Sequence, residues 1–242
     1  MTPSRAATAR ERARAELTRE IREEARRQLA ATGADGLSLR AVARELGMVS
    51  SAIYRYYPSR DELLTGLIID AYDAVGEATE RAAAAPGAAG RARWVAACRA
   101  IRDWARSNPH EYALIYGSPV PGYRAPEATI GPASRVPVAF AGIVAAASAN
   151  GELGGGRSGP GGRAEPPAGG ELAAQAAATV AALSVPGVPP GALVRAVIAW
   201  TQLIGMISFE LFGQFVGSFD PPDALFGFAV GQLAAFIGFA EA

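Results

Sequence analysis

Apolar residues recur at helical spacing along most of the chain, and no run alternates apolar and polar side chains convincingly enough to indicate strands. The first apolar stripe lies in a segment, residues 9–29, that is otherwise dense in Arg and Glu. Its members are Leu17, Ile21, Ala25 and Leu29, which predicts an amphipathic helix packed on the helices that follow. Further helices are expected at 60–84, 90–107, 109–116, 134–149, 171–183, 190–216 and 221–240. The pattern therefore predicts an all-α protein.

Two short runs of apolar residues at helical spacing, separated by a glycine, lie between residues 36 and 63. Ser38 has the side chain of a good N-cap. The stripe that follows it is Leu39, Val42, Ala43 and Leu46. Gly47 stands where this helix must stop, because glycine tolerates the left-handed backbone of a helix end. Met48 is expected to fill the angle between the two helices.

A second helix is expected to begin at Val49 or Ser50 and to end before Pro58, because the residue before a proline avoids the helical region. Its inward-facing residues would be Ala52 and Ile53, with Tyr56 or Tyr57 one turn later. Two short helices joined by a tight turn predict a helix-turn-helix. In this motif the second helix, here residues 50–57, enters the major groove of DNA.

These residues resemble the DNA-binding domain of the tetracycline-repressor (TetR) family of bacterial transcription regulators. The matching runs are residues 37–47 (LSLRAVARELG) and 50–64 (SSAIYRYYPSRDELL). Residues 200–205 also resemble a Trp-x-x-x-His-Gly element of some members, with Ile204 standing where the histidine would be. A second departure is Val49, where many members carry Ser or Thr, so the phosphate contact expected there moves to Ser50.

The resemblance implies a three-helix DNA-binding domain over residues 1–60 and a larger helical domain over 61–242 that binds an effector and dimerises. Residues 151–170 are rich in Gly and Pro, which predicts a flexible loop within the second domain. Dimerisation is expected through 171–183, 190–216 and 221–240. The apolar run 224–240 is shorter than the ~20 residues of a membrane span, so a subunit interface explains it better than a membrane anchor.

Side-chain chemistry selects candidate DNA contacts. The residues expected to contact base edges or the rim of the groove are Ser50, Ser51, Tyr54 and Arg55. Tyr54 could also bind phosphate. Backbone phosphates would be held by Ser38, Arg40, Tyr56 and Arg60. The Arg-rich start of the chain is either a DNA-contacting arm or a solvated tail.

Charge and composition support a protein that meets phosphates at one end. Residues 1–63 hold 12 Arg against 9 acidic residues, whereas residues 64–242 hold 11 Arg against 14. The single cysteine, Cys98, and the single histidine, His110, leave no pair for a disulfide and no set for a multi-histidine metal site. We expect Cys98 to be a buried apolar residue, and we expect no enzyme activity, metal or cofactor. Residues 1–30 lack the apolar core of a secretory signal, which favours the cytoplasm.

Aromatic residues concentrated in the middle of the chain are candidate walls of an effector pocket. They are Trp94, Trp104, His110, Tyr112, Tyr116, Tyr123, Phe140 and Trp200, joined by Ile115 and Phe209. Any one of them could instead belong to the core, and His110 could simply cap a helix. The expected function is a ligand-responsive regulator, most readily a repressor that releases its operator on binding a largely apolar molecule. The alternatives are a helical carrier or enzyme with an incidental helix-turn-helix, and an architectural DNA binder.

Overall fold

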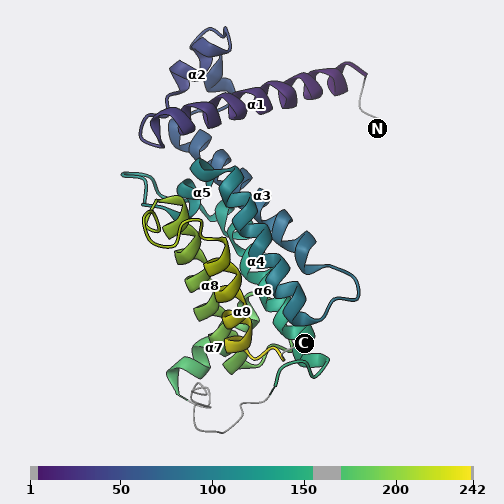
Figure 1. The fold of residues 1–242 in the computed structure, drawn as a ribbon. Coiled ribbons are helices and arrows are strands. Elements are labelled where there is room, and N and C mark those ends of the chain that lie inside the picture. The colour runs from purple at the N-terminus through teal and green to yellow at the C-terminus, as the bar shows by residue number, and fades with distance from the viewer. Residues whose placement is uncertain (1–4, 155–169, 241–242) are drawn as a thin grey trace. The chain divides into compact units, whose positions relative to one another are not determined.

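The structure, a computed structural model, describes residues 5–154 and 170–240. In chain order its helices are α1 (Arg5–Thr32), α2 (Leu39–Glu45), the 3-10 turn η1 (Ile53–Arg55), α3 (Arg60–Ala83), α4 (Gly90–Ser107), α5 (Pro109–Tyr116), the 3-10 turn η2 (Glu127–Thr129), α6 (Ile130–Ala149), α7 (Glu171–Ala182), α8 (Pro190–Leu211) and α9 (Asp223–Ile237) (Figure 1). Within the described residues, extended pairing is limited to a bridge between Leu153 and Phe239. The all-α prediction is confirmed.

The chain forms two compact units. Unit 1 comprises Met1–Tyr72 and Asn108–Ile130, and unit 2 comprises Asp73–Ser107 and Gly131–Ala242. Helix α3 contributes its first half to unit 1 and its second half to unit 2. Helix α5 also belongs to unit 1. The boundary expected after residue 60, between a DNA-binding and an effector-binding domain, stays a prediction.

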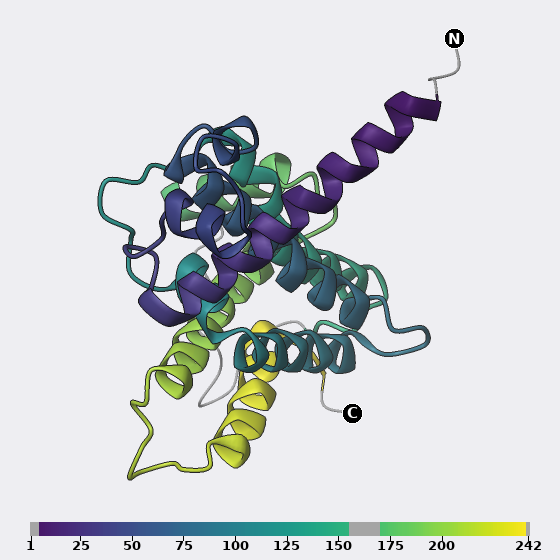
Figure 2. The same cartoon turned by 90° about the horizontal axis from the view of Figure 1, so that it is seen from above.

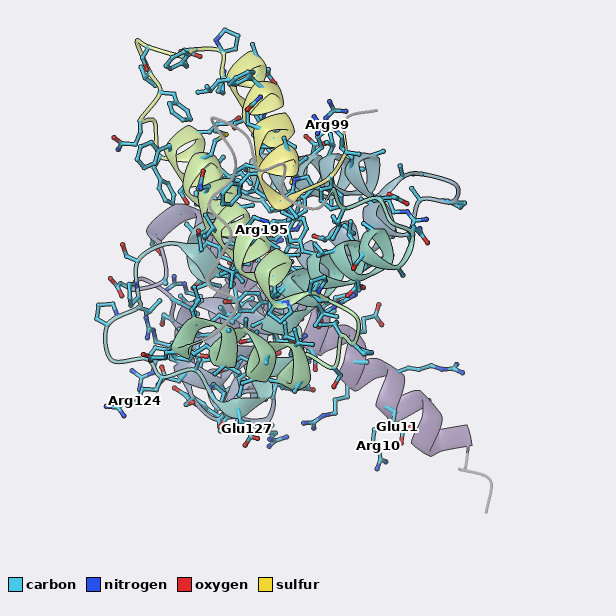
Figure 3. All side chains as sticks on the ribbon, turned by 90° about the horizontal axis from the view of Figure 1, so that it is seen from below. Arg10, Glu11, Arg99, Arg124, Glu127 and Arg195 are labelled. Atoms are coloured by element: carbon cyan, nitrogen blue, oxygen red, sulfur yellow. The ribbon has the colours of Figure 1, made fainter. Side chains whose placement is uncertain are left out.

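Unit 1 is built around the apolar stripe of α1. Ile21, Ala25 and Leu29 are buried, as their spacing predicts. Ile21 and Ala25 join a core that includes Leu39, Val42, Ala43, Ile53, Tyr57, Leu63, Leu64 and Leu67. Residues 9–16 of α1 are exposed and extend beyond the helices packed on its C-terminal half (Figure 2). Arg10 and Glu11 lie on this projecting part (Figure 3).

Unit 2 is a bundle of apolar helices in which α7 packs on α8, and α8 packs on α9. Helix α4 supplies buried Trp94, Cys98 and Ile101 to its core. Cys98 is a buried free thiol, as expected, and burial raises its pKa, which makes the reactive thiolate scarce. Helix α8 and the segment Glu127–Ala149 are long and apolar enough for a membrane span by length and composition, but core helices of soluble proteins pass the same test.

Three sequence expectations need correction. Residues 50–57 form turns around the short 3-10 element η1 rather than a regular second helix. Serine, isoleucine and tyrosine are weak helix formers, and Pro58 prevents the segment from lengthening. Helix α8 ends at Leu211, not at residue 216, and Gly213 follows with a left-handed φ of 76°. Helix α9 is shorter than the expected 221–240. The expected loop 151–170 stays a prediction, because most of it lies outside the described residues.

Candidate nucleic-acid interface

The turn after α2 is fixed by local hydrogen bonds. The Ser38 hydroxyl accepts from the backbone N–H of Ala41 at 3.4 Å, so it caps α2 as predicted. Gly47 has φ of 64°, its N–H donates to the Arg44 carbonyl at 3.1 Å, and the Met48 N–H donates to the Ala43 carbonyl at 2.8 Å. These two bonds form the Schellman motif, which ends a helix and redirects the chain sharply.

The segment that follows, residues 50–55, is called the reading segment from here on. Ile53 is 0% exposed and anchors it in the core, with buried Tyr57 just beyond its end. The four residues predicted to face DNA bases, Ser50, Ser51, Tyr54 and Arg55, are all exposed. The reading segment thus presents hydroxyls, a phenol and a guanidinium to solvent from a firmly anchored backbone.

The residues predicted to bind DNA phosphates differ in their exposure and in their hydrogen-bond partners. Arg40 is exposed, and Tyr56 is half-buried beneath the Arg14 guanidinium, which lies 5.2 Å from its ring centre. Arg14 also donates to the Arg55 carbonyl at 3.2 Å. Arg60 instead donates to two backbone carbonyls, of Ala34 at 2.7 Å and Leu37 at 3.2 Å. Its guanidinium therefore holds the connection between α1 and α2.

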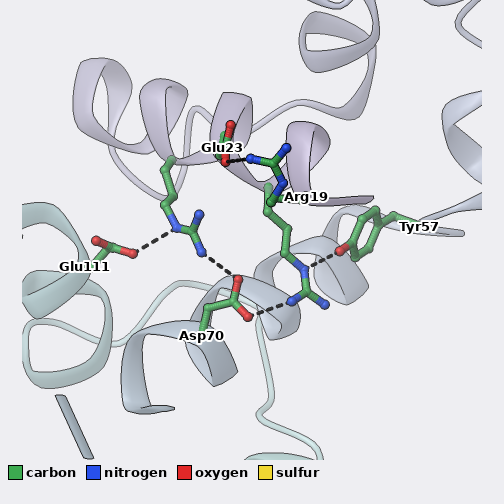
Figure 4. Close-up of polar contacts among 7 residues, drawn as sticks. Arg19, Glu23, Tyr57, Asp70 and Glu111 are labelled. Atoms are coloured by element: carbon green, nitrogen blue, oxygen red, sulfur yellow. Dashed lines mark hydrogen bonds and ion pairs between the residues drawn. The ribbon is translucent and has the colours of Figure 1, made fainter. Parts of the chain in front are cut away.

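Sequence reasoning missed a polar network that joins α1, α3 and α5 to the end of the reading segment (Figure 4). Arg22 donates from Nε to the Tyr57 hydroxyl and from Nη1 to Asp70, both at 2.6 Å. Arg26 donates to Asp70 at 2.6 Å and to Glu111 at 3.0 Å. Burial alone would lower the pKa of Arg22, but its bonds to Tyr57 and Asp70 leave that pKa raised. The partners lie 35–85 residues apart, and no local pattern signals them.

The residues predicted to line one effector pocket fall in both units. His110, Tyr112, Tyr116 and Tyr123 belong to unit 1, and Trp94, Trp104, Phe140 and Trp200 belong to unit 2. In unit 1, Tyr112 is buried, and its ring centre lies 5.2 Å from that of Tyr116. Burial raises the pKa of Tyr116. The Tyr123 hydroxyl lies 2.8 Å from that of Thr65, and His110 is exposed in the first turn of α5.

Unit 2 contains a cavity of about 200 Å³ between α6, α7 and α8. Its walls are Pro137, Phe140, Ala141, Thr179, Leu183, Leu193, Ala196, Val197 and Trp200. Two predicted pocket residues, Phe140 and Trp200, thus line a cavity. Trp94 packs against Phe140 with ring centres 4.5 Å apart, but is not among the lining residues. The cavity is apolar apart from the Thr179 hydroxyl, which donates to the Gln175 carbonyl at 2.9 Å, and the Trp200 indole.

Comparisons with known proteins agree with this arrangement. The family model "Bacterial regulatory proteins, tetR family" matches residues 21–67, and "Tetracyclin repressor-like, C-terminal domain" matches residues 94–233. An HTH-type transcriptional regulator of Mycobacterium tuberculosis, Rv1816, is 41% identical over 208 residues, which cover 84% of each chain. The chain belongs to the TetR family. This TetR-family protein is a transcriptional regulator with a helix-turn-helix DNA-binding domain.

Two solved structures support the same fold for the TetR-family chain. The structure of the regulatory-protein candidate SCO4313 superposes with a TM-score of 0.72 and 35% identity, over 96% of this chain and 98% of that one. A protein of unknown function from Rhodococcus sp. RHA1 superposes with a TM-score of 0.68 and 24% identity, over 93% and 96% of the two chains. These comparisons give no support to a carrier or an enzyme with an incidental helix-turn-helix.

Proposed function

We propose that this TetR-family regulator is a cytoplasmic, ligand-responsive repressor that binds its operator as a homodimer. A small, largely apolar molecule bound in unit 2 would release the operator. The observation that carries the DNA-reading part is the reading segment, where the buried side chain of Ile53 fixes a backbone whose neighbouring polar side chains face solvent.

The reading segment supplies the direct contacts. Arg55 can donate two hydrogen bonds to a guanine, and the hydroxyls of Ser50, Ser51 and Tyr54 can reach bases or phosphates. We assign the phosphate contacts that set its register to Arg40, Tyr56 and Ser38. Arg60 remains a weaker candidate for phosphate binding, because two of its nitrogens already donate to backbone carbonyls.

The homodimer is proposed to form through α8 and α9, which carry exposed apolar side chains. On α8 these include Val197, Ile198 and Phe209, and on α9 Phe228. Gly205 and Gly227 have open space where a Cβ would stand, so another backbone could approach there. Exposed apolar patches of this kind mark interaction surfaces, and a two-fold dimer suits a nearly palindromic operator. Burial in a dimer also accounts for the apolar character of α8 without a membrane.

The effector is proposed to occupy the cavity between α6, α7 and α8. Its walls favour an apolar molecule, and its size of about 200 Å³ favours a small one. Pro137 lies within α6 and lines the cavity. Because proline has no N–H to donate to the preceding turn, α6 is locally weakened where the ligand would bind. Ligand binding would favour a conformation in which the two reading segments of the dimer no longer match the spacing of the major grooves. Helix α3 would be the connecting helix.

A binding titration tests the DNA-reading proposal. Labelled duplexes from the DNA around the protein's own gene are titrated with the wild type, with Tyr54→Ala/Arg55→Ala and with Arg99→Ala. We expect the double variant to weaken specific binding by tenfold or more, about 1–3 kcal/mol for each lost contact. Arg99→Ala also loses one positive charge, but from an exposed site on α4, and should bind like the wild type. Circular dichroism checks that the fold is retained.

The outcomes separate the alternatives. Absence of binding to any duplex at low salt contradicts the proposal and favours a carrier or an enzyme. Equal, weak binding to all duplexes favours an architectural DNA binder, because phosphate contacts carry no sequence information.

A further inference from the structure

We propose that five side chains, Tyr57, Arg22, Asp70, Arg26 and Glu111, act together as positioning residues that hold the reading segment in its DNA-binding geometry. We call them the α1–α3–α5 network (Figure 4). The inference rests on the proposed DNA-reading function and adds to it the part of the molecule that sets the reading geometry.

The network holds the chain where the reading segment ends. Tyr57 follows Arg55 by two residues, and its ring is buried in the core of unit 1. Arg22 of α1 fixes the other end of this side chain by donating to its hydroxyl at 2.6 Å. Eight residues earlier on α1, Arg14 donates to the Arg55 carbonyl. Helix α1 therefore holds the end of the reading segment at two points.

Asp70 links this contact to two further helices. It accepts from Arg22 and from Arg26 at 2.6 Å, so one carboxylate of α3 fixes two arginines one turn apart on α1. Arg26 then reaches Glu111 of α5 at 3.0 Å. The arginine side chains are 33% exposed, Asp70 is 20% and Glu111 18% exposed, so these pairs are partly shielded from water. Shielding makes such charge-assisted bonds stronger and more directional than exposed pairs.

The alternative role for these arginines, binding DNA phosphate, fits the contacts less well. Arg22 and Arg26 line an open groove along α1 together with Arg14 and Arg19, which could suggest an anion site. However, two arginines and two carboxylates balance within the network, and both arginines already donate to carboxylate oxygens. Their guanidinium groups are therefore committed to holding α1, α3 and α5 together.

Helix α5 gives the network a regulatory connection. Glu111 lies in its first turn, and α5 begins at Pro109, two residues after α4 ends at Ser107. A displacement of α5 along its axis would pull on Arg26, and through Asp70 on Arg22 and Tyr57. Operator affinity would then depend on the position of α5 although α5 carries none of the proposed DNA contacts.

The sign of the mutational effect separates positioning from charge. Removing the negative charge of Glu111 makes unit 1 more positive, and by electrostatics alone this tightens binding to every duplex. Loss of positioning instead weakens binding, and it does so for the preferred duplex only. The informative quantity is therefore the specificity ratio, the affinity for the preferred duplex divided by that for a scrambled duplex of equal length at the same salt.

The experiment begins by selecting the preferred duplex from a random pool with wild-type protein. The specificity ratio is then measured for the wild type, Tyr57→Phe, Glu111→Ala and Glu111→Gln. Glu23→Ala is the matched control, because Glu23 pairs with Arg19 on the same helix at 3.0 Å, and this pair stands apart from the hydrogen bonds drawn for the network (Figure 4). Hydrogen exchange over residues 50–57 is followed in each variant.

We expect Tyr57→Phe and Glu111→Ala to lower the specificity ratio about tenfold, the size of one interaction in a coupled network. Both should speed exchange over residues 50–57. Glu111→Gln, which keeps an acceptor oxygen for Arg26, should recover part of the loss, and Glu23→Ala should leave ratio and exchange unchanged. If Glu111→Ala fails to fold, Tyr57→Phe carries the test, because it keeps the buried ring.

The possible failures are distinguishable. If the wild type selects no duplex, the proposed function falls, and the inference falls with it. If the wild type selects a duplex but Tyr57→Phe keeps both the ratio and the exchange rate, only the inference is overturned.

Discussion

Each unit contains a network centred on arginine, and the two differ in burial. In unit 2, Arg102 of α4 donates to both carboxylate oxygens of Glu210 at 2.7 and 2.9 Å and to Asp223 at 3.0 Å. Arg102 and Glu210 are 8% and 11% exposed, and the guanidinium lies 4.5 Å from the ring centre of Phe226. The α1–α3–α5 network of unit 1 uses the same groups with more water around them.

This difference indicates different roles. A buried ion pair must stay intact, because separating it leaves a desolvated charge without a partner. The Arg102 network therefore fixes α4, α8 and the start of α9 as one scaffold, including the helices proposed to dimerise. The network of unit 1 is less buried than the Arg102–Glu210 pair, so separating its contacts costs less. Such contacts suit a segment whose position changes with the regulatory state.

The largest expected effect comes from breaking the buried pair. Arg102→Ala should lower the free energy of unfolding of unit 2 by about 3–5 kcal/mol, because Glu210 keeps its charge in a buried site with only the longer contact to Arg106 left. Urea denaturation of purified protein measures the loss. Arg106, which is 51% exposed and lies 3.7 Å from Glu210, is the matched control. Arg106→Ala should cost less than about 1 kcal/mol, and equal losses would contradict the distinction drawn from burial.

A smaller loss is expected in unit 1. Asp70→Asn leaves Arg22 its bond to Tyr57 and leaves Arg26 its bond to Glu111, so each guanidinium keeps one partner. We expect a loss of about 2 kcal/mol in the free energy of unfolding, the cost of weakening hydrogen bonds to partly buried charged groups. The same urea titration checks it. A loss as large as that of Arg102→Ala would mean that the two networks do not differ in kind.

The turn before the reading segment should show an effect that depends on backbone geometry alone. Gly47 has φ of 64° with open space around its Cα, so Gly47→Ala should cost about 1–2 kcal/mol from the left-handed backbone. Gly142 lies within α6, also with open space, but its φ is not positive. Gly142→Ala should stabilise by about 0.5–1 kcal/mol. Thermal unfolding of the pair measures both, and a shift of the same sign would contradict this account of the turn.

The smallest expected effect is a pH dependence in unit 2. Hydrogen bonds from Arg135 lower the pKa of Glu80 below its usual 4.5. Because its folded pKa is depressed, Glu80 contributes stability that is present above pH 4.5 and is lost as the pH falls through the folded value. Glu80→Gln should therefore be less stable than the wild type at pH 7, and the difference should shrink steadily as the pH falls below 4.5. Urea midpoints at pH 7 and below pH 4.5 check this, and a constant difference would contradict it.

Local chemistry was enough to predict much of the fold. Helices α4 and α5 have the predicted bounds, because Pro86, Gly87 and Asn108–Pro109 interrupt or start helices wherever they occur. Ser38 and Gly47 likewise act through their nearest neighbours. The reading segment departs from prediction because a periodic pattern does not reveal how short a helix becomes when its residues are weak helix formers.

The candidate site was predictable only in part. Exposure of Ser50, Ser51, Tyr54 and Arg55 follows from their position around the inward-facing Ile53, and the sequence shows that position. Arg60 binds a backbone carbonyl that is distant in sequence, and Tyr57 accepts from a distant arginine. Only tertiary packing brings these partners together. For the same reason, aromatic composition pointed to a pocket, while only Phe140 and Trp200 among the eight residues line the cavity.

The central claim is that two reading segments in a homodimer meet successive major grooves. Val49 is 74% exposed beside the reading segment, whereas the natural cysteine, Cys98, is buried, so Val49→Cys can be spin-labelled selectively. Double electron–electron resonance on the labelled protein bound to its selected duplex measures the distance between the two spin labels, one beside each reading segment. The account predicts one distance of about 34 Å, a single turn of DNA. Absence of an intermolecular distance, or one that fits no whole number of turns, would contradict it.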